Sequence, residues 1–159
     1  MGTEMRLVAL TVVAALGWPC AAAAEVQWSL GKEKGRPFLS GMQNESEVDF
    51  EFWARCRADK DIDVRMGAES HVGKGKGEKV ELTLASAGQS AKVVGVSRLS
   101  VNSEMTGGIE LQGKVKRDDP LFAVLATGQP ISVTGPIKPL KWGVKGLKPK
   151  VAAFLKSCQ

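Results

Sequence analysis

The sequence offers few side chains that could act as a base or a nucleophile. His71 is the only histidine of the chain, and it lies in the stretch from Gly67 to Lys79, whose glycines and lysines predict a loop. A hydrolytic triad needs a base that is held beside a nucleophile, and nothing in this stretch would fix an imidazole ring. No serine lies in the G-x-S-x-G pattern of a nucleophile elbow. The sequence therefore gives no support to nucleophilic catalysis.

Carboxylates are the remaining candidates for catalysis. Glu47, Asp49 and Glu51 share one face of a predicted strand, where successive neighbours lie ~7 Å apart. Glycosidases use paired carboxylates, so a hydrolase of the cell envelope that also uses Asp61 and Glu110 is the enzymatic alternative. It predicts a concave pocket in which at least two of these groups have a raised pKa. Because a single strand provides no opposite wall, we expect a non-enzymatic protein.

Metal ligands are incomplete. Asp59, Asp61 and Asp63 have the spacing that opens an EF-hand loop, but Val64 stands where the loop needs glycine and Ser70 where it needs a bidentate glutamate. One histidine and two separated cysteines do not make a zinc site. We therefore predict no metal and no other cofactor.

The N-terminus is typical of a cleavable signal peptide over residues 1–24. Arg6 supplies a positive charge, residues 7–16 form an apolar run, and Ala22–Ala24 precede Glu25 as an A-x-A cleavage site. The alternatives are an uncleaved N-terminal helix and a lipoprotein signal at Cys20, although a lipobox does not have tryptophan and proline before its cysteine. We expect export, to the periplasm of a Gram-negative bacterium or into the medium.

The cysteines of the mature chain predict a disulfide. Cleavage would remove Cys20 and leave Cys56 and Cys158, which both fall on apolar faces of predicted elements. An even number of cysteines in an exported chain favours a structural bond over a metal site or a reactive thiol. In the chain-entropy model, closing so long a loop would stabilise the fold by roughly 4 to 5 kcal/mol.

The cysteine at position 56 ends the stretch on which the fold prediction is centred, residues 48–57. Val48, Phe50, Phe52, Ala54 and Cys56 alternate with polar residues, as in a strand with one buried face. Similar alternation over 26–30, 37–41, 62–66, 80–84, 92–101, 109–115, 131–133 and 140–144 predicts further strands, with a bulge near 95–97. Trp28 and Trp142 fall on the apolar side.

Two helices interrupt this pattern. Asp118 or Asp119 before Pro120 predicts a short helix near 120–126, and apolar residues at helical spacing predict a C-terminal helix near 147–157. Residues 25–159 are thus predicted to form a single domain. Its fold class is mainly β, with α+β as the alternative: about seven to nine mostly antiparallel strands in a curved sheet, sandwich or partly closed barrel, with the C-terminal helix packed on the sheet.

Two surfaces are candidates for binding. Trp53 and Arg55 lie on the polar face of the central strand, where a large aromatic ring can stack on a sugar or a partner side chain. From Lys114 to Gln159 there are nine bases and two acids within a net charge of +5, and Lys141, Lys145 and Lys148 could form one basic face. The alternative for these lysines is that they only keep the protein soluble.

These features favour a binding or accessory protein of the cell envelope with an unidentified ligand. The expected partner is an envelope protein or an anionic glycan or lipid surface. Nucleic acid is not expected, because arginines and exposed aromatic residues are scarce in the basic part, and no transmembrane span is predicted. The functional alternative is a secreted inhibitor or effector that acts on another protein.

Overall fold

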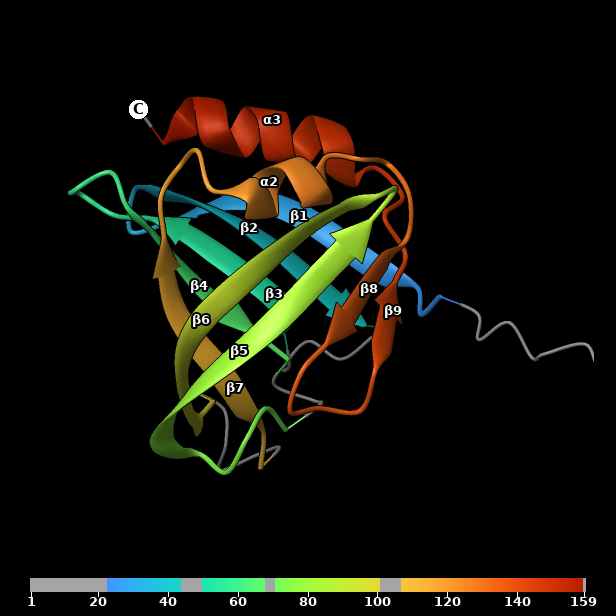
Figure 1. Cartoon of the computed structure of the whole chain (residues 1–159). Coiled ribbons are helices and arrows are strands. Elements are labelled where there is room, and N and C mark those ends of the chain that lie inside the picture. The colour runs from blue at the N-terminus through green and yellow to red at the C-terminus, as the bar shows by residue number, and fades with distance from the viewer. Residues whose placement is uncertain (1–22, 44–49, 68–70, 101–106, 159) are drawn as a thin grey trace, which may run out of the picture.

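The computed structural model describes residues 23–43, 50–67, 71–100 and 107–158, so the predicted signal peptide lies almost entirely outside it. The described residues form nine strands and two helices (Figure 1). The strands are β1 (Val26–Glu33), β2 (Arg36–Gln43), β3 (Phe50–Cys56), β4 (Ile62–Met66), β5 (Lys76–Ser86), β6 (Gln89–Leu99), β7 (Ile109–Val115), β8 (Ile131–Thr134) and β9 (Leu140–Trp142). The helices are α2 (Pro120–Leu125) and α3 (Leu147–Ser157).

The strands make one antiparallel sheet that curls into a nearly closed barrel, which confirms the predicted fold class. The strand order is β1-β2-β3-β4-β7-β6-β5-β8-β9. The two ends of the sheet meet at Ala24, whose backbone N–H donates to Lys141 O at 2.8 Å and whose carbonyl accepts from Gly143 N at 2.8 Å. A chain that is cleaved after Ala24 would lack both of these hydrogen bonds.

The interior of the barrel is filled by alternating apolar side chains. Trp28, Phe52 and Trp142 form its aromatic centre, with ring centroids 5.9 to 6.3 Å apart, and Trp142 is fully buried. Trp28 Nε1 also donates to Gly143 O at 2.8 Å, so this ring fastens β1 to the chain that follows β9. Both tryptophans predicted to be core therefore contribute to closing the barrel.

Both helices lie over one end of the barrel (Figure 1). In α2, Asp119 Oδ1 accepts a hydrogen bond from Leu121 N at 2.9 Å and Pro120 occupies the first turn, as the sequence predicts. Helix α3 buries Leu147, Val151 and Phe154 against β1 and β2. Within the described part of the chain, neither helix has the length and apolar character needed to cross a membrane.

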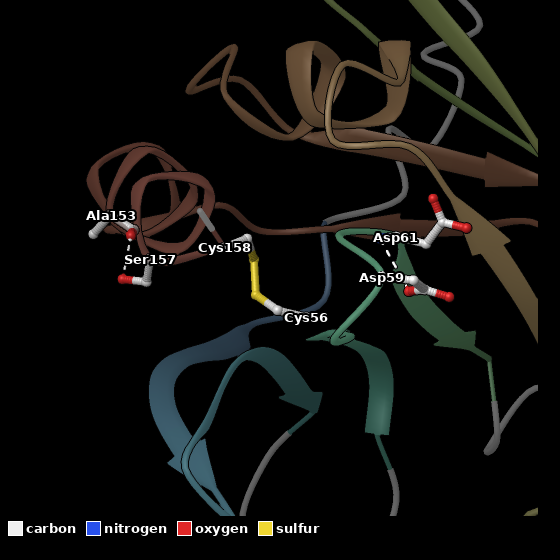
Figure 2. Close-up of a disulfide and its surroundings, with 6 residues drawn as sticks. All are labelled: Cys56, Asp59, Asp61, Ala153, Ser157 and Cys158. Carbon is white, nitrogen blue, oxygen red and sulfur yellow. Dashed lines mark hydrogen bonds between the residues drawn. A yellow bond between two sulfur atoms is a disulfide. The ribbon is translucent and has the colours of Figure 1, made fainter.

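The predicted disulfide is present. Cys56 at the end of β3 bonds to Cys158 just after α3, with their Cα atoms 5.4 Å apart (Figure 2), a spacing typical of disulfides. Both cysteines are 5% exposed. The bond closes a loop across a sequence separation of 102 and holds the C-terminal helix on the barrel end.

The glycine- and lysine-rich loop is organised around a single carboxylate. Glu78 accepts hydrogen bonds from the backbone N–H groups of Lys74 and Lys76, the latter at 2.9 Å. Ser97 is fully buried and supports the same turn, because its Oγ donates to Val72 O at 2.6 Å and accepts from Gly75 N at 2.7 Å. Buried Ser97 also explains why the alternation looked irregular near 95–97.

No bulge is needed in β6, since Ala91, Val93 and Ser97 keep one parity. The register shift lies instead in β5, between Lys76 and Lys79. The predicted bulge near 95–97 was therefore placed on the wrong strand. A polar residue at an inward position caused the error, because periodicity alone assigns serine to the solvent side.

We expect the stability of this loop to depend on pH through Glu78. Hydrogen bonds from the backbone N–H of Lys74, then from that of Glu78 itself, lower the pKa of this carboxyl below its ordinary value. A depressed pKa in the folded state means that the stabilisation is fully present above the pKa of the unfolded chain and is lost as the pH falls through the folded-state pKa.

Glu78→Gln should therefore lower the melting temperature at neutral pH, and the difference from the native chain should disappear in acid. Glu81→Gln is the matched control, since among the described residues Glu81 pairs only with Lys92, on the surface. Equal pH profiles for the native chain and Glu78→Gln would contradict this account.

Candidate functional site

The central feature of the outer sheet face is Trp53, whose ring is covered by two arginines. Trp53 is 6% exposed, although it lies on the outward parity of β3. The guanidinium carbon of Arg65, its direct partner on β4, lies 4.4 Å from the ring centroid, and that of Arg55 lies 5.0 Å from it. These are cation–π distances. The indole is thus the packed centre of a polar cluster, and its ring faces are already in contact with cations.

Acidic side chains hold the two arginines in place. Arg55 pairs with Glu33 at 3.0 Å and with Asp63 at 4.0 Å. The Nε atom of Arg65 lies 3.8 Å from Glu110 Oε1, and Glu110 is 3% exposed. Its contacts with Glu110 and Trp53 hold the guanidinium of Arg65 in position. The side chain of Arg65 is 25% exposed, so it still reaches solvent.

A β-bulge brings a second aromatic ring beside Trp53. The pairing of β2 with β3 shifts register so that Gly41 faces Phe52 while Met42 faces Phe50. The shift rotates Phe50 onto the outer side, whereas uninterrupted alternation placed it in the core with Phe52. The expectation that Phe50 faces inward is therefore wrong, and the outer face gains a half-buried aromatic side chain.

These residues line a hollow of about 680 Å³, which we call the outer groove. Its apolar lining comes from Phe38, Met42 and Phe50, and its cations are Lys32 and Arg65. Phe38 lies across Gly31, since a Cβ atom at Gly31 would be 2.7 Å from Phe38 Cζ. A side chain at position 31 would thus displace this ring, so the glycine allows Phe38 to lie flat against β1.

A second hollow of about 510 Å³ lies on the other side of Trp53 and Arg65, over β4, β7 and β6. Val94, Val96 and Lys114 contribute to its lining. Trp53 and Arg65 line both hollows. Arg65 is therefore the one cation that the two hollows share.

The basic residues predicted as a binding surface lie elsewhere. Lys141 is half-buried on β9, opposite Ser132 of β8. Lys145 precedes α3 and Lys148 lies in its first turn, and both are exposed. Strands β3 and β9 are not neighbours in the sheet. The structure thus places the Trp53 cluster and the lysines on separate parts of the surface.

The candidate catalytic carboxylates line neither hollow. Glu51 is buried on β3 and Glu110 is buried on β7. Asp61 lies in the turn before β4 and accepts from Lys116 Nζ at 2.8 Å. Glu47 and Asp49 are outside the described residues. None of the described members of this set therefore lines either of the two hollows beside Trp53.

The aspartates that resemble the start of an EF-hand are paired with cations. Arg57 donates hydrogen bonds to Asp59 at 3.2 Å and to Asp63 at 3.1 Å, and these bonds raise the pKa of its guanidinium, the bond to Asp59 most. Among the described residues, no group of three or more histidine, cysteine or acidic side chains is arranged to hold a metal ion. The predicted turn from Asp59 to Asp61 joins β3 to β4 (Figure 2), and Asp63 lies in β4.

The sequence matches no protein-family model, no curated protein and no solved structure at a significant level.

Sequence reasoning identified Trp53 and Arg55 but missed Arg65, Phe38, Met42 and Phe50. The sequence carried a signal for two of these residues. Phe38 and Met42 have the same parity as Ser40, so the outer face of β2 carries apolar residues as well as the inner face. The partner of Trp53 on β4 depends on strand register, which a single sequence does not reveal.

Proposed function

We propose that this protein is an exported, non-enzymatic binding module of the cell envelope, and that its ligand lies in the outer groove. The observation that carries the proposal is the combination of half-buried Phe38, Met42 and Phe50 with the cation Arg65 around one hollow. Ligand sites are typically concave and mostly apolar, with a small number of placed polar groups. The outer groove has this composition.

The barrel interior is a weaker candidate for the ligand. Small barrels of other proteins hold ligands inside when side chains leave room there. Here Trp28, Phe52 and Trp142 pack against one another at the centre. A ligand on the outside of the sheet requires no displacement of this cluster.

Export is supported by two features of the chain. The N-terminal pattern is typical of a signal peptide, and disulfides persist mainly in oxidising compartments such as the periplasm. The Cys56–Cys158 bond is compatible with that location. An extracytoplasmic binding module is the role that fits both features.

A photo-crosslinking experiment in cells tests this proposal. The full chain is expressed in a Gram-negative bacterium with a photo-reactive residue at Lys32, an exposed position that lines the outer groove. The matched control has the same residue at Lys92, an exposed lysine on β6 that pairs with Glu81 at 2.8 Å. We expect a discrete adduct from position 32 and none from position 92. No adduct from position 32, or equal adducts from both positions, would contradict the proposal.

A further inference from the structure

Arg65 lines the outer groove. Its Nε side faces Glu110 at 3.8 Å, and its guanidinium lies over Trp53. Its two terminal nitrogens make no hydrogen bond within the described part of the chain. A guanidinium binds a carboxylate through two parallel N–H donors. Arg65 is thus oriented in advance, by one aromatic ring and one carboxylate, for an anion that enters the groove.

Two acids near Arg65 pair with other cations, and a third, Glu110, pairs with Arg65 itself on its Nε side. Glu33 also lines the outer groove, but it bonds Arg55 at 3.0 Å. Asp63 bonds Arg57 at 3.1 Å, and Glu110 is buried on the Nε side of Arg65. Lys32, at the rim, makes no ion pair within the described residues. Among the described residues that line the groove, Lys32 is therefore the charge left without an ion pair, and the terminal nitrogens of Arg65 are donors left without an acceptor.

The rest of the outer groove is apolar. Phe38, Met42 and Phe50 are each half-buried, so each can bury further surface when a ligand covers it. Burial of an alkyl chain against them is favourable, because apolar surface is removed from water. A volume of about 680 Å³ lies within the range of small-molecule sites. An unbranched alkyl chain matches this lining, and a free sugar, which is polar on most of its surface, does not.

We propose that the outer groove binds an anionic amphiphile, a single alkyl chain that ends in a carboxylate, with the carboxylate on Arg65 and the chain on Phe38, Met42 and Phe50. This inference rests on the proposed function, since it names the ligand class for the same groove. It assigns to Arg65 the role of selecting the charge of the ligand.

Calorimetric titration of the full mature chain tests the inference with three probes: decanoate, decanol and acetate. Decanoate carries both the chain and the charge, decanol only the chain, and acetate only the charge. We expect decanoate to bind at least tenfold more tightly than decanol, and acetate not to bind measurably. Arg65→Gln should lower the affinity for decanoate to that for decanol, while the control Arg98→Gln, at an exposed arginine outside both hollows, should leave it unchanged.

Arg65→Lys keeps a positive charge opposite Glu110. It therefore tests the inference even if Arg65→Gln fails to fold. It should still bind decanoate, but severalfold more weakly, because an ammonium cannot form the paired contact. Equal binding of decanoate and decanol would overturn the charge selection and leave the binding module intact. No binding of decanoate, together with an adduct to a protein at Lys32, would overturn the amphiphile and favour a protein partner. A missing adduct at Lys32 would count against the proposed function itself.

Discussion

The double variant Cys56→Ser/Cys158→Ser should unfold with a free energy roughly 3 to 5 kcal/mol below that of the oxidised chain. The bond spans 102 residues of sequence, so in the unfolded state it restricts most of the domain. It also ties α3, which contributes buried Leu147, Val151 and Phe154, to the end of β3. A loss of this size is comparable with the total stability of many small domains.

Urea denaturation followed by circular dichroism measures this effect, with and without reductant. The matched control is Ser157→Ala, because the hydroxyl of Ser157 donates only to Ala153 O one turn earlier in α3, at 2.8 Å (Figure 2). That control should change the free energy of unfolding by less than about 0.5 kcal/mol. If the double variant were as stable as the control, the disulfide would not stabilise the fold as we propose.

Trp142→Ala should lower the free energy of unfolding by roughly 3 to 5 kcal/mol, the range for removing a large buried aromatic side chain. Trp142 is fully buried and its ring contacts both Trp28 and Phe52. It also lies at the end of β9, beside Gly143, whose carbonyl accepts the hydrogen bond from Trp28 Nε1 of β1. The alanine variant therefore loses packing at the point where the two ends of the sheet meet.

Trp142→Phe is the informative comparison for this position. Nε1 of Trp142 is buried without a hydrogen-bond partner among the described residues, so phenylalanine would remove an unsatisfied polar group together with part of the ring volume. We expect a smaller loss than for alanine, measured by the same denaturation. Equal losses for the two variants would mean that ring packing at the barrel centre is not what stabilises the closure.

The alternation of apolar residues was enough to predict the sheet and much of its core. Phe52, Trp28 and Trp142 all face inward as expected. In a strand with one buried face, every second side chain points to that face. The disulfide could be predicted for the same reason, since Cys56 lies on that face and Cys158 on the buried stripe of a helix. The predicted export and the position of both cysteines on buried faces together indicated that these two thiols form a bond.

The candidate site was less predictable, because it depends on register and on a bulge. Phe50 lies outside only because β3 gains one residue relative to β2, and alternation cannot place such a shift. Trp53 was recognised as unusual, but Arg65, which covers it, is its partner across β3 and β4. Contacts of this kind join distant parts of the sequence, so composition and spacing in one segment do not reveal them.

The most direct test of the outer groove is the indole N–H spectrum of the protein during titration with decanoate. Of the four tryptophans in the chain, Trp18 belongs to the predicted signal peptide, which leaves Trp28, Trp53 and Trp142 in the mature protein. Trp53 lines the groove, whereas Trp28 and Trp142 lie inside the barrel. We predict that decanoate shifts the Trp53 signal and leaves the other two in place; shifts of Trp28 and Trp142 with an unchanged Trp53 would place the ligand inside the barrel and contradict this account.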